Sequence, residues 1–206
     1  LYISPTGYPL LEHPLYPDLE LANLLRSANT IVYHKSSEKI ERYGPAWAWD
    51  DFTKYFSPER SSLPIYGNVI MITKLENGEL RVKPNIFNVN LDSTSSQSYT
   101  RKENINDFTI NPLKIKLNDT LLIPYIVSDR TTNSLLKHIT QKEVISKSSE
   151  LRDSKKIYSK IPAKIYQAIL KKSDNLISES LLANVGYTYT DTISIRKGID
   201  KTLEKL

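Results

Sequence analysis

Hydrophobic and polar positions follow two different periods along the chain, and the change between them lies near residue 140. Before it, short alternating runs predict strands, and two stretches of helical spacing interrupt them. The strands are expected at 2–3, 31–33, 66–75, 80–90, 112–117 and 121–127, and the helices at about 17–29 and 130–139. Beyond residue 160 the apolar residues recur at helical spacing, in groups that begin at Ile161, Leu176 and Ile195.

The segments between these runs predict turns and loops. Glu76-Asn77-Gly78 is typical of a hairpin turn between two strands. Residues 91–107 are rich in Ser, Thr, Asn and charge, so we expect a mobile loop there. Residues 141–156 are polar and charged, which suits a crossing between domains. We therefore expect an α+β domain over 1–145 and a helical part over 146–206.

Composition excludes several classes of protein. The 206 residues include no cysteine, so disulfides, zinc–thiolate sites and cysteine nucleophiles are absent. No apolar run approaches the ~20 residues that a membrane-spanning helix needs. The net charge of +5 raises the question of nucleic acid, but the basic residues are scattered. Their one loose cluster, at Lys155, Lys156, Lys160, Lys164, Lys171 and Lys172, is typical of a solvated helix face, so we expect no nucleic-acid partner.

Conventional site signatures are mostly missing. His13, His34 and His138 are far apart in sequence, and the pattern favours surface or capping roles and no metal site. The six glycines stand singly, so no phosphate-binding loop is expected, and no Gly-x-Ser-x-Gly elbow occurs. We expect no cofactor.

The tripeptide Ser173-Asp174-Asn175 stands between two helical patterns. A Ser or Asp before a helix is most often an N-cap, and that interpretation stays open. Residues two apart face nearly opposite ways on a helix, so Ser173 and Asn175 can share a cleft only at a joint between helices. Such a joint would turn Asp174 into the body of the protein.

The run Lys-Lys-Ser-Asp-Asn-Leu over 171–176, followed by Glu179, resembles the second active-site motif of penicillin-binding serine D-Ala-D-Ala carboxypeptidases. It is most similar to the subgroup with a large insertion before this motif. Three further stretches resemble that subgroup in the same order: 1–11, 44–58 and 67–69. Two departures are Tyr8 in place of the family's Asp and Ala46 in place of its Gly.

The resemblance implies a fold, a location and partners. We expect an antiparallel-sheet insertion domain with flanking helices, followed by a helical segment of the penicillin-recognising transpeptidase-like domain. The complete enzyme is expected to be exported, to the periplasm or outside the cell, and to act on peptidoglycan peptides and bind β-lactams. It would cut the terminal D-Ala from stem peptides, and the endopeptidase reaction on cross-links stays open.

The resemblance also implies roles for individual residues. Ser173 would pass a proton to the departing D-Ala nitrogen, and Asn175 would hydrogen-bond the substrate carbonyl and hold the catalytic lysine. Asp51 and Phe56 would line the far end of the cleft and bind substrate. Trp47 and Trp49 are either packing anchors or substrate contacts, and packing is favoured.

The parts that the family uses for nucleophilic attack are expected outside this chain. Its Ser-x-x-Lys motif should precede Leu1 and its Lys-Thr-Gly motif should follow Leu206, so the chain is interpreted as an inactive internal fragment. The run from Ser36 to Lys39 fits Ser-x-x-Lys but lies in a polar turn. The alternative hypothesis is a non-catalytic cell-wall or protein-binding module.

Overall fold

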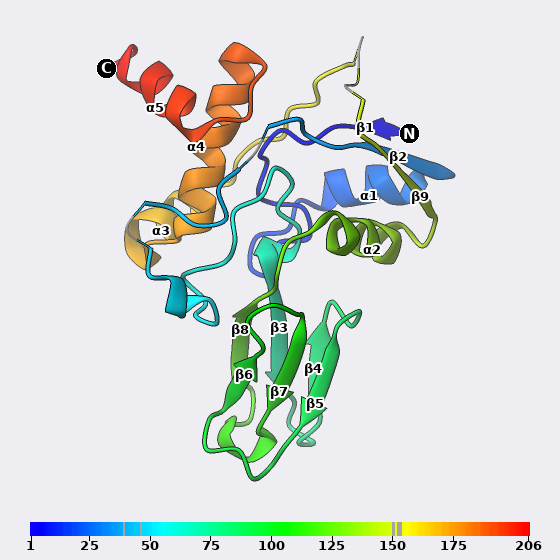
Figure 1. Ribbon diagram of the computed structural model, residues 1–206, viewed down its shortest axis with the longest axis vertical. Helices are drawn as coiled ribbons and strands as arrows, with labels where there is room; N and C mark the ends of the chain where they lie inside the picture. The colour runs from blue at the N-terminus through cyan, green and yellow to red at the C-terminus, as the bar shows by residue number, and fades with distance from the viewer. Residues whose placement is uncertain (39, 46, 150, 152–153) are drawn as a thin grey trace.

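The computed structural model describes residues 1–38, 40–45, 47–149, 151 and 154–206. It is an α+β protein in which one end consists of strands and the other carries the helices around a small further sheet (Figure 1). The fold class expected from the sequence is confirmed.

A three-stranded parallel sheet joins segments that are far apart in sequence. Its order is β1 (Tyr2–Ile3), β2 (Thr30–His34) and β9 (Glu143–Lys147). Two helices accompany it in Figure 1, α1 (Leu19–Ser27) and α2 (Asp129–Thr140). Each begins at a side chain that accepts a backbone hydrogen bond, Asp18 for α1 and Ser128 for α2.

The strand-rich end contains two further sheets. The antiparallel sheet has the order β4 (Leu80–Lys83), β3 (Val69–Lys74) and β8 (Thr120–Pro124), and the mixed sheet β5 (Asn88–Leu91), β7 (Asp107–Ile110) and β6 (Tyr99–Arg101). Ile70, Phe108 and Ile123 are fully buried in the core that these sheets share with α1 and α2. Burial of such side chains stabilises the fold by about 1.5–3 kcal/mol each.

Three helices complete the chain: α3 (Ala163–Lys172), α4 (Asn175–Thr190) and α5 (Ile195–Leu203). A small core of Leu10, Ile165, Ala168 and Ile177 holds α3 and α4 together. The N-terminal segment therefore packs on these helices, and Asn184 Nδ2 donates to the Thr6 carbonyl at 2.9 Å. The three predicted C-terminal helices are confirmed.

Five local expectations were wrong. The strand expected over 80–90 is two strands in different sheets, since Pro84 has no N–H to continue a ladder. The loop expected over 91–107 contains β6, and the strand expected over 112–117 is a 3₁₀ turn, Pro112–Lys114, after β7. The polar crossing over 141–156 contains β9. Lys155, Lys156 and Lys160 precede α3 and lie on no helix.

The expected division after residue 145 lies inside β9, which pairs with β2. The two-domain boundary stays a prediction.

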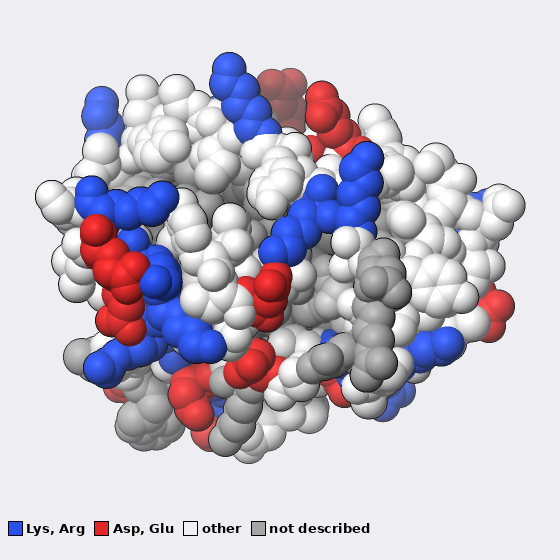
Figure 2. All heavy atoms as spheres, turned by 90° about the horizontal axis from the view of Figure 1, so that it is seen from above, with Lys and Arg blue, Asp and Glu red and all other residues white. Residues whose placement is uncertain are grey.

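Basic residues are interspersed with acidic ones on the face seen in Figure 2.

The α4–α5 contact requires glycine. A Cβ on Gly198 would lie 1.8 Å from the Leu182 carbonyl oxygen. We therefore expect Gly198→Ala to lower the free energy of unfolding by about 1–3 kcal/mol, although alanine is the better helix former. Arg196→Ala, at an exposed position of the same helix, should change it by less than about 0.5 kcal/mol. Thermal unfolding of the three proteins measures this, and a Gly198→Ala variant at least as stable as wild type would contradict it.

Candidate active site

The link between α3 and α4 is two residues long. Ser173 adopts a left-handed conformation, φ 50° and ψ 48°, and its backbone N–H donates to the Ala168 carbonyl. Asp174 is extended and caps α4, because its carboxylate accepts a hydrogen bond from the Ile177 N–H at 3.0 Å. The expected helix–helix joint is confirmed.

Ser173 and Asn175 line the same cavity, which has a volume of about 200 Å³. The left-handed backbone at Ser173 makes this possible, since in a continuous helix residues two apart face away from each other. Ser173 is exposed, and within the part of the chain that the structure describes no hydrogen bond holds its hydroxyl. The hydroxyl is therefore free to hydrogen-bond a bound molecule.

Tyr55, Phe56 and Pro58 form another wall of this cavity. Residues 55–60 are fastened to the start of α4. Asn175 Nδ2 donates to the Phe56 carbonyl at 3.1 Å. One turn further along α4, Glu179 Oε2 lies 3.2 Å from Arg60 Nη1. These two contacts fix the distance between Phe56 and the helix–helix joint.

Arg60 also holds a third segment. Its Nε donates to the Glu41 carbonyl at 2.8 Å and its Nη2 to the Tyr43 carbonyl. The next residue, Gly44, lies so close to α4 that a Cβ on it would be 2.7 Å from Glu179 Oε1. One guanidinium thus connects residues 41–44 to α4.

The remaining walls are mostly apolar and include Pro14, Leu15, Val69 and Leu122.

Two titratable residues of the cavity have shifted pKa values. His13 is 5% exposed, and burial lowers the pKa of its imidazole to about 4, so it is neutral at pH 7. Burial also raises the pKa of Asp174, against the hydrogen bond from Ile177 N–H, which lowers it.

The structure brings Ser173, Asn175 and Phe56 together, whereas Asp51 does not line this cavity. Asp51 ends a 3₁₀ turn, Trp49–Asp51. Trp47 does not line this cavity, and it does not line the larger cavity described below. Its ring centroid lies 6.5 Å from the ring centroid of Tyr43. The side chain of Trp49 is outside the description.

Sequence reasoning missed His13 and Lys172 as cavity residues. The expected capping role of His13 is present, because its Nδ1 accepts from the backbone N–H groups of Leu15 and Tyr16 at 3.2 Å each. No sequence signal placed it near Ser173, since the approach of residues 13 and 173 is a tertiary contact.

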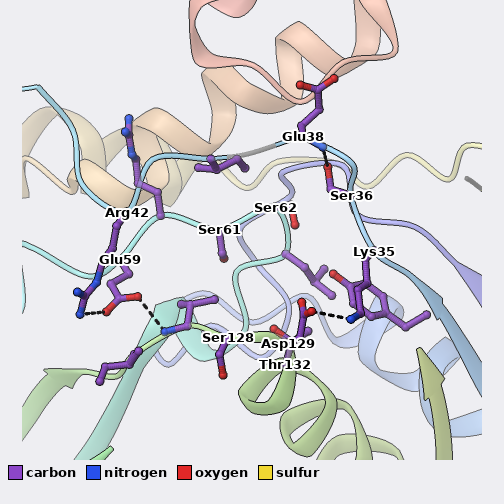
Figure 3. Close-up of a pocket in the computed structure, with 16 residues that line it drawn as sticks. Lys35, Ser36, Glu38, Arg42, Glu59, Ser61, Ser62, Ser128, Asp129 and Thr132 are labelled. Atoms are coloured by element: carbon purple, nitrogen blue, oxygen red, sulfur yellow. Dashed lines mark hydrogen bonds and ion pairs between the residues drawn. The ribbon is translucent and has the colours of Figure 1, made fainter. Parts of the chain in front are cut away.

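A larger cavity of about 480 Å³ lies elsewhere (Figure 3). Its charges compensate one another: Lys35 Nζ lies 2.5 Å from Asp129 Oδ2, and Arg42 Nη2 lies 2.7 Å from Glu59 Oε1. Ser36 lines it, and its hydroxyl accepts from the Glu38 N–H in a turn. Lys39, the other half of the Ser-x-x-Lys run, lies outside the described residues.

Among the described residues, no group of three or more His, Asp or Glu could hold a metal ion. None of their helices is long and apolar enough to cross a membrane.

Comparison with known proteins shows the fold. No protein-family model matches the chain, and no curated protein does. The structure is similar to that of penicillin-binding protein 4 from Haemophilus influenzae, with a TM-score of 0.62 at 17% identity, over 100% of this chain and 53% of that one. A structure of the same protein with a novel β-lactam matches with a TM-score of 0.54 at 16% identity, over 96% and 49%. This chain thus has the penicillin-binding-protein type of fold and spans about half the length of those chains.

A double-mutant cycle measures how much the Arg60–Glu179 contact contributes to the free energy of unfolding. Arg60 and Glu179 have side chains 11% and 21% exposed, so solvent screens their interaction only partly. We expect a coupling energy of about 1–3 kcal/mol between Arg60→Gln and Glu179→Gln in urea unfolding. The exposed Lys201–Glu204 pair is the control, with about 0.2–1 kcal/mol. Additive effects at residues 60 and 179 would contradict a fastening role.

Proposed function

We propose that this chain is part of a serine-type D-Ala-D-Ala carboxypeptidase that acts on peptidoglycan stem peptides. The observation that carries the proposal is the pairing of Ser173 and Asn175 on one cavity, at a joint where Ser173 has left-handed backbone geometry. The same left-handed geometry ends α2 at Gln141 and α4 at Asp191, so at Ser173 it is the C-cap of α3. What distinguishes this joint is that its Ser and its Asn both line one cavity.

In the proposed reaction, a nucleophilic serine outside residues 1–206 attacks the carbonyl carbon of the penultimate D-Ala. The C–N bond to the terminal D-Ala breaks, and an acyl-enzyme forms that water then hydrolyses. Ser173 passes the proton to the departing nitrogen. Asn175, whose Nδ2 is tied to the Phe56 carbonyl, has its side-chain oxygen and second amide hydrogen left for the lysine of the nucleophile motif and the substrate.

Two further observations support the proposal. The fold is similar to that of a penicillin-binding protein whose structure has been determined with a β-lactam. The Asp174 side chain caps α4. This suits a structural role for Asp174, between the proposed functional residues Ser173 and Asn175. The substrate implies an exported enzyme, in the periplasm or outside the cell. A non-catalytic cell-wall or protein-binding module is the alternative, and it gives the exposed Ser173 hydroxyl no task.

The proposal is tested in the complete parent protein by single-turnover acylation with an acyl-D-Ala-D-Ala peptide. Ser173→Ala should slow acylation by ~10²–10⁴-fold, as loss of a positioned proton-transfer group does, with little change in melting temperature. Asn175→Ala should act in the same direction, and Asp174→Ala chiefly through stability, by about 1 kcal/mol. Ser178→Ala, on the same helix, is the control. If Ser173→Ala is acylated at a near-normal rate but has a lowered melting temperature, Ser173-Asp174-Asn175 only caps a helix and the proposal is wrong.

Asp51 is proposed to act in the choice of substrate. A carboxylate at the far end of the cleft would make a charge-assisted hydrogen bond to a free side-chain ammonium. We expect Asp51→Ala to weaken turnover of peptides with that amine by about tenfold, the value of ~1.4 kcal/mol, and to spare simple acyl-D-Ala-D-Ala. Equal losses with both substrates would make Asp51 a structural residue.

A further inference from the structure

His13 has one polar atom that its own turn does not use. Its Nδ1 accepts two backbone hydrogen bonds, from Leu15 and Tyr16, so the neutral ring must carry its hydrogen on Nε2. Stacking on Tyr16, with 5.3 Å between ring centroids, holds the ring plane. Among the described residues, none accepts a hydrogen bond from Nε2.

The Nε2 edge belongs to a tightly built wall. Gly67 lies against it, and a Cβ on Gly67 would be 3.1 Å from both Cδ2 and Nε2 of His13. Both residues line the cavity that Ser173 and Asn175 share. Nε2 is not among the described buried polar atoms that lack a partner, so its N–H is open to the cavity and can donate to an acceptor bound there.

The charges around the cavity favour the same ligand. Of the described residues that line it, Lys172 is the one cation and Asp174 the one carboxylate. One oxygen of Asp174, Oδ1, already accepts a hydrogen bond from the N–H of Ile177. An ammonium group would therefore meet a cation and a carboxylate that caps a helix, whereas an oxygen acceptor would meet N–H and O–H donors.

We propose that this cavity takes a substrate group with an apolar body that ends in an acceptor oxygen, a carboxamide or carboxylate, and that His13 Nε2–H binds that oxygen. The inference rests on the proposed carboxypeptidase function. In this proposal His13 determines specificity through substrate binding. The ammonium group expected near Asp51 then binds in a different part of the cleft.

The test uses two peptides of matched length, acyl-Gln-D-Ala-D-Ala and acyl-norleucine-D-Ala-D-Ala, with the complete parent protein. The carboxamide of glutamine offers the acceptor that norleucine lacks. We expect KM to be ~3- to 10-fold lower for the glutamine peptide, the range of one net hydrogen bond, with similar kcat.

His13→Asn should abolish this preference by raising KM for the glutamine peptide alone. An Asn side-chain oxygen can replace Nδ1 as acceptor from the following N–H groups, so the turn is kept and only the Nε2–H donor is lost. Melting temperature checks that the turn survives, and His138→Asn, a histidine that does not line the cavity, should keep the preference.

The outcomes separate the two proposals. If wild type turns over both peptides and Ser173→Ala is slow, but His13→Asn leaves the KM ratio unchanged or lowers kcat for both peptides alike, the role of His13 is overturned and the carboxypeptidase function stands. If wild type turns over neither peptide and is not labelled by a fluorescent penicillin, the proposed function fails and the inference fails with it.

Discussion

The Arg60 guanidinium is the group on which the arrangement of the site depends. It is nearly buried, and a buried guanidinium is stable only when its N–H groups find acceptors. Those acceptors come from Glu179 on α4 and from the carbonyls of Glu41 and Tyr43. Satisfying one side chain therefore draws residues 41–44 and 55–60 onto the helix that begins at Asn175.

A second constraint comes from the backbone of another wall, beside Gly67. Tyr66, Gly67 and Asn68 all have positive φ, between 53° and 61°. Asn68 stabilises this turn, since its buried amide donates to the Glu59 carbonyl at 2.7 Å and its oxygen accepts from the Ile65 N–H. The turn starts β3 at Val69 and leaves Gly67 against His13. Left-handed backbone at Ser173 and at Gly67 thus contributes to two walls of one cavity.

The contrast between predicted and observed elements follows from the range of the interactions. The joint at 173–174 was predictable because helical periodicity and capping act over a few residues. β9 was not, since its sequence is mostly polar and it exists through pairing with β2, more than a hundred residues earlier. The family resemblance predicted that Phe56 lies near Ser173-Asp174-Asn175. No local sequence pattern predicted that His13 lies near it.

We propose that residues 1–206 supply the proton-transfer wall of an active site whose nucleophile lies elsewhere in the parent protein. The most direct measurement is to label the parent protein with penicillin, digest it and locate the covalent adduct by mass spectrometry. The account predicts one adduct, on a serine outside residues 1–206 that is followed three positions later by lysine. An adduct on Ser36, Ser173 or any other serine within the chain would contradict it.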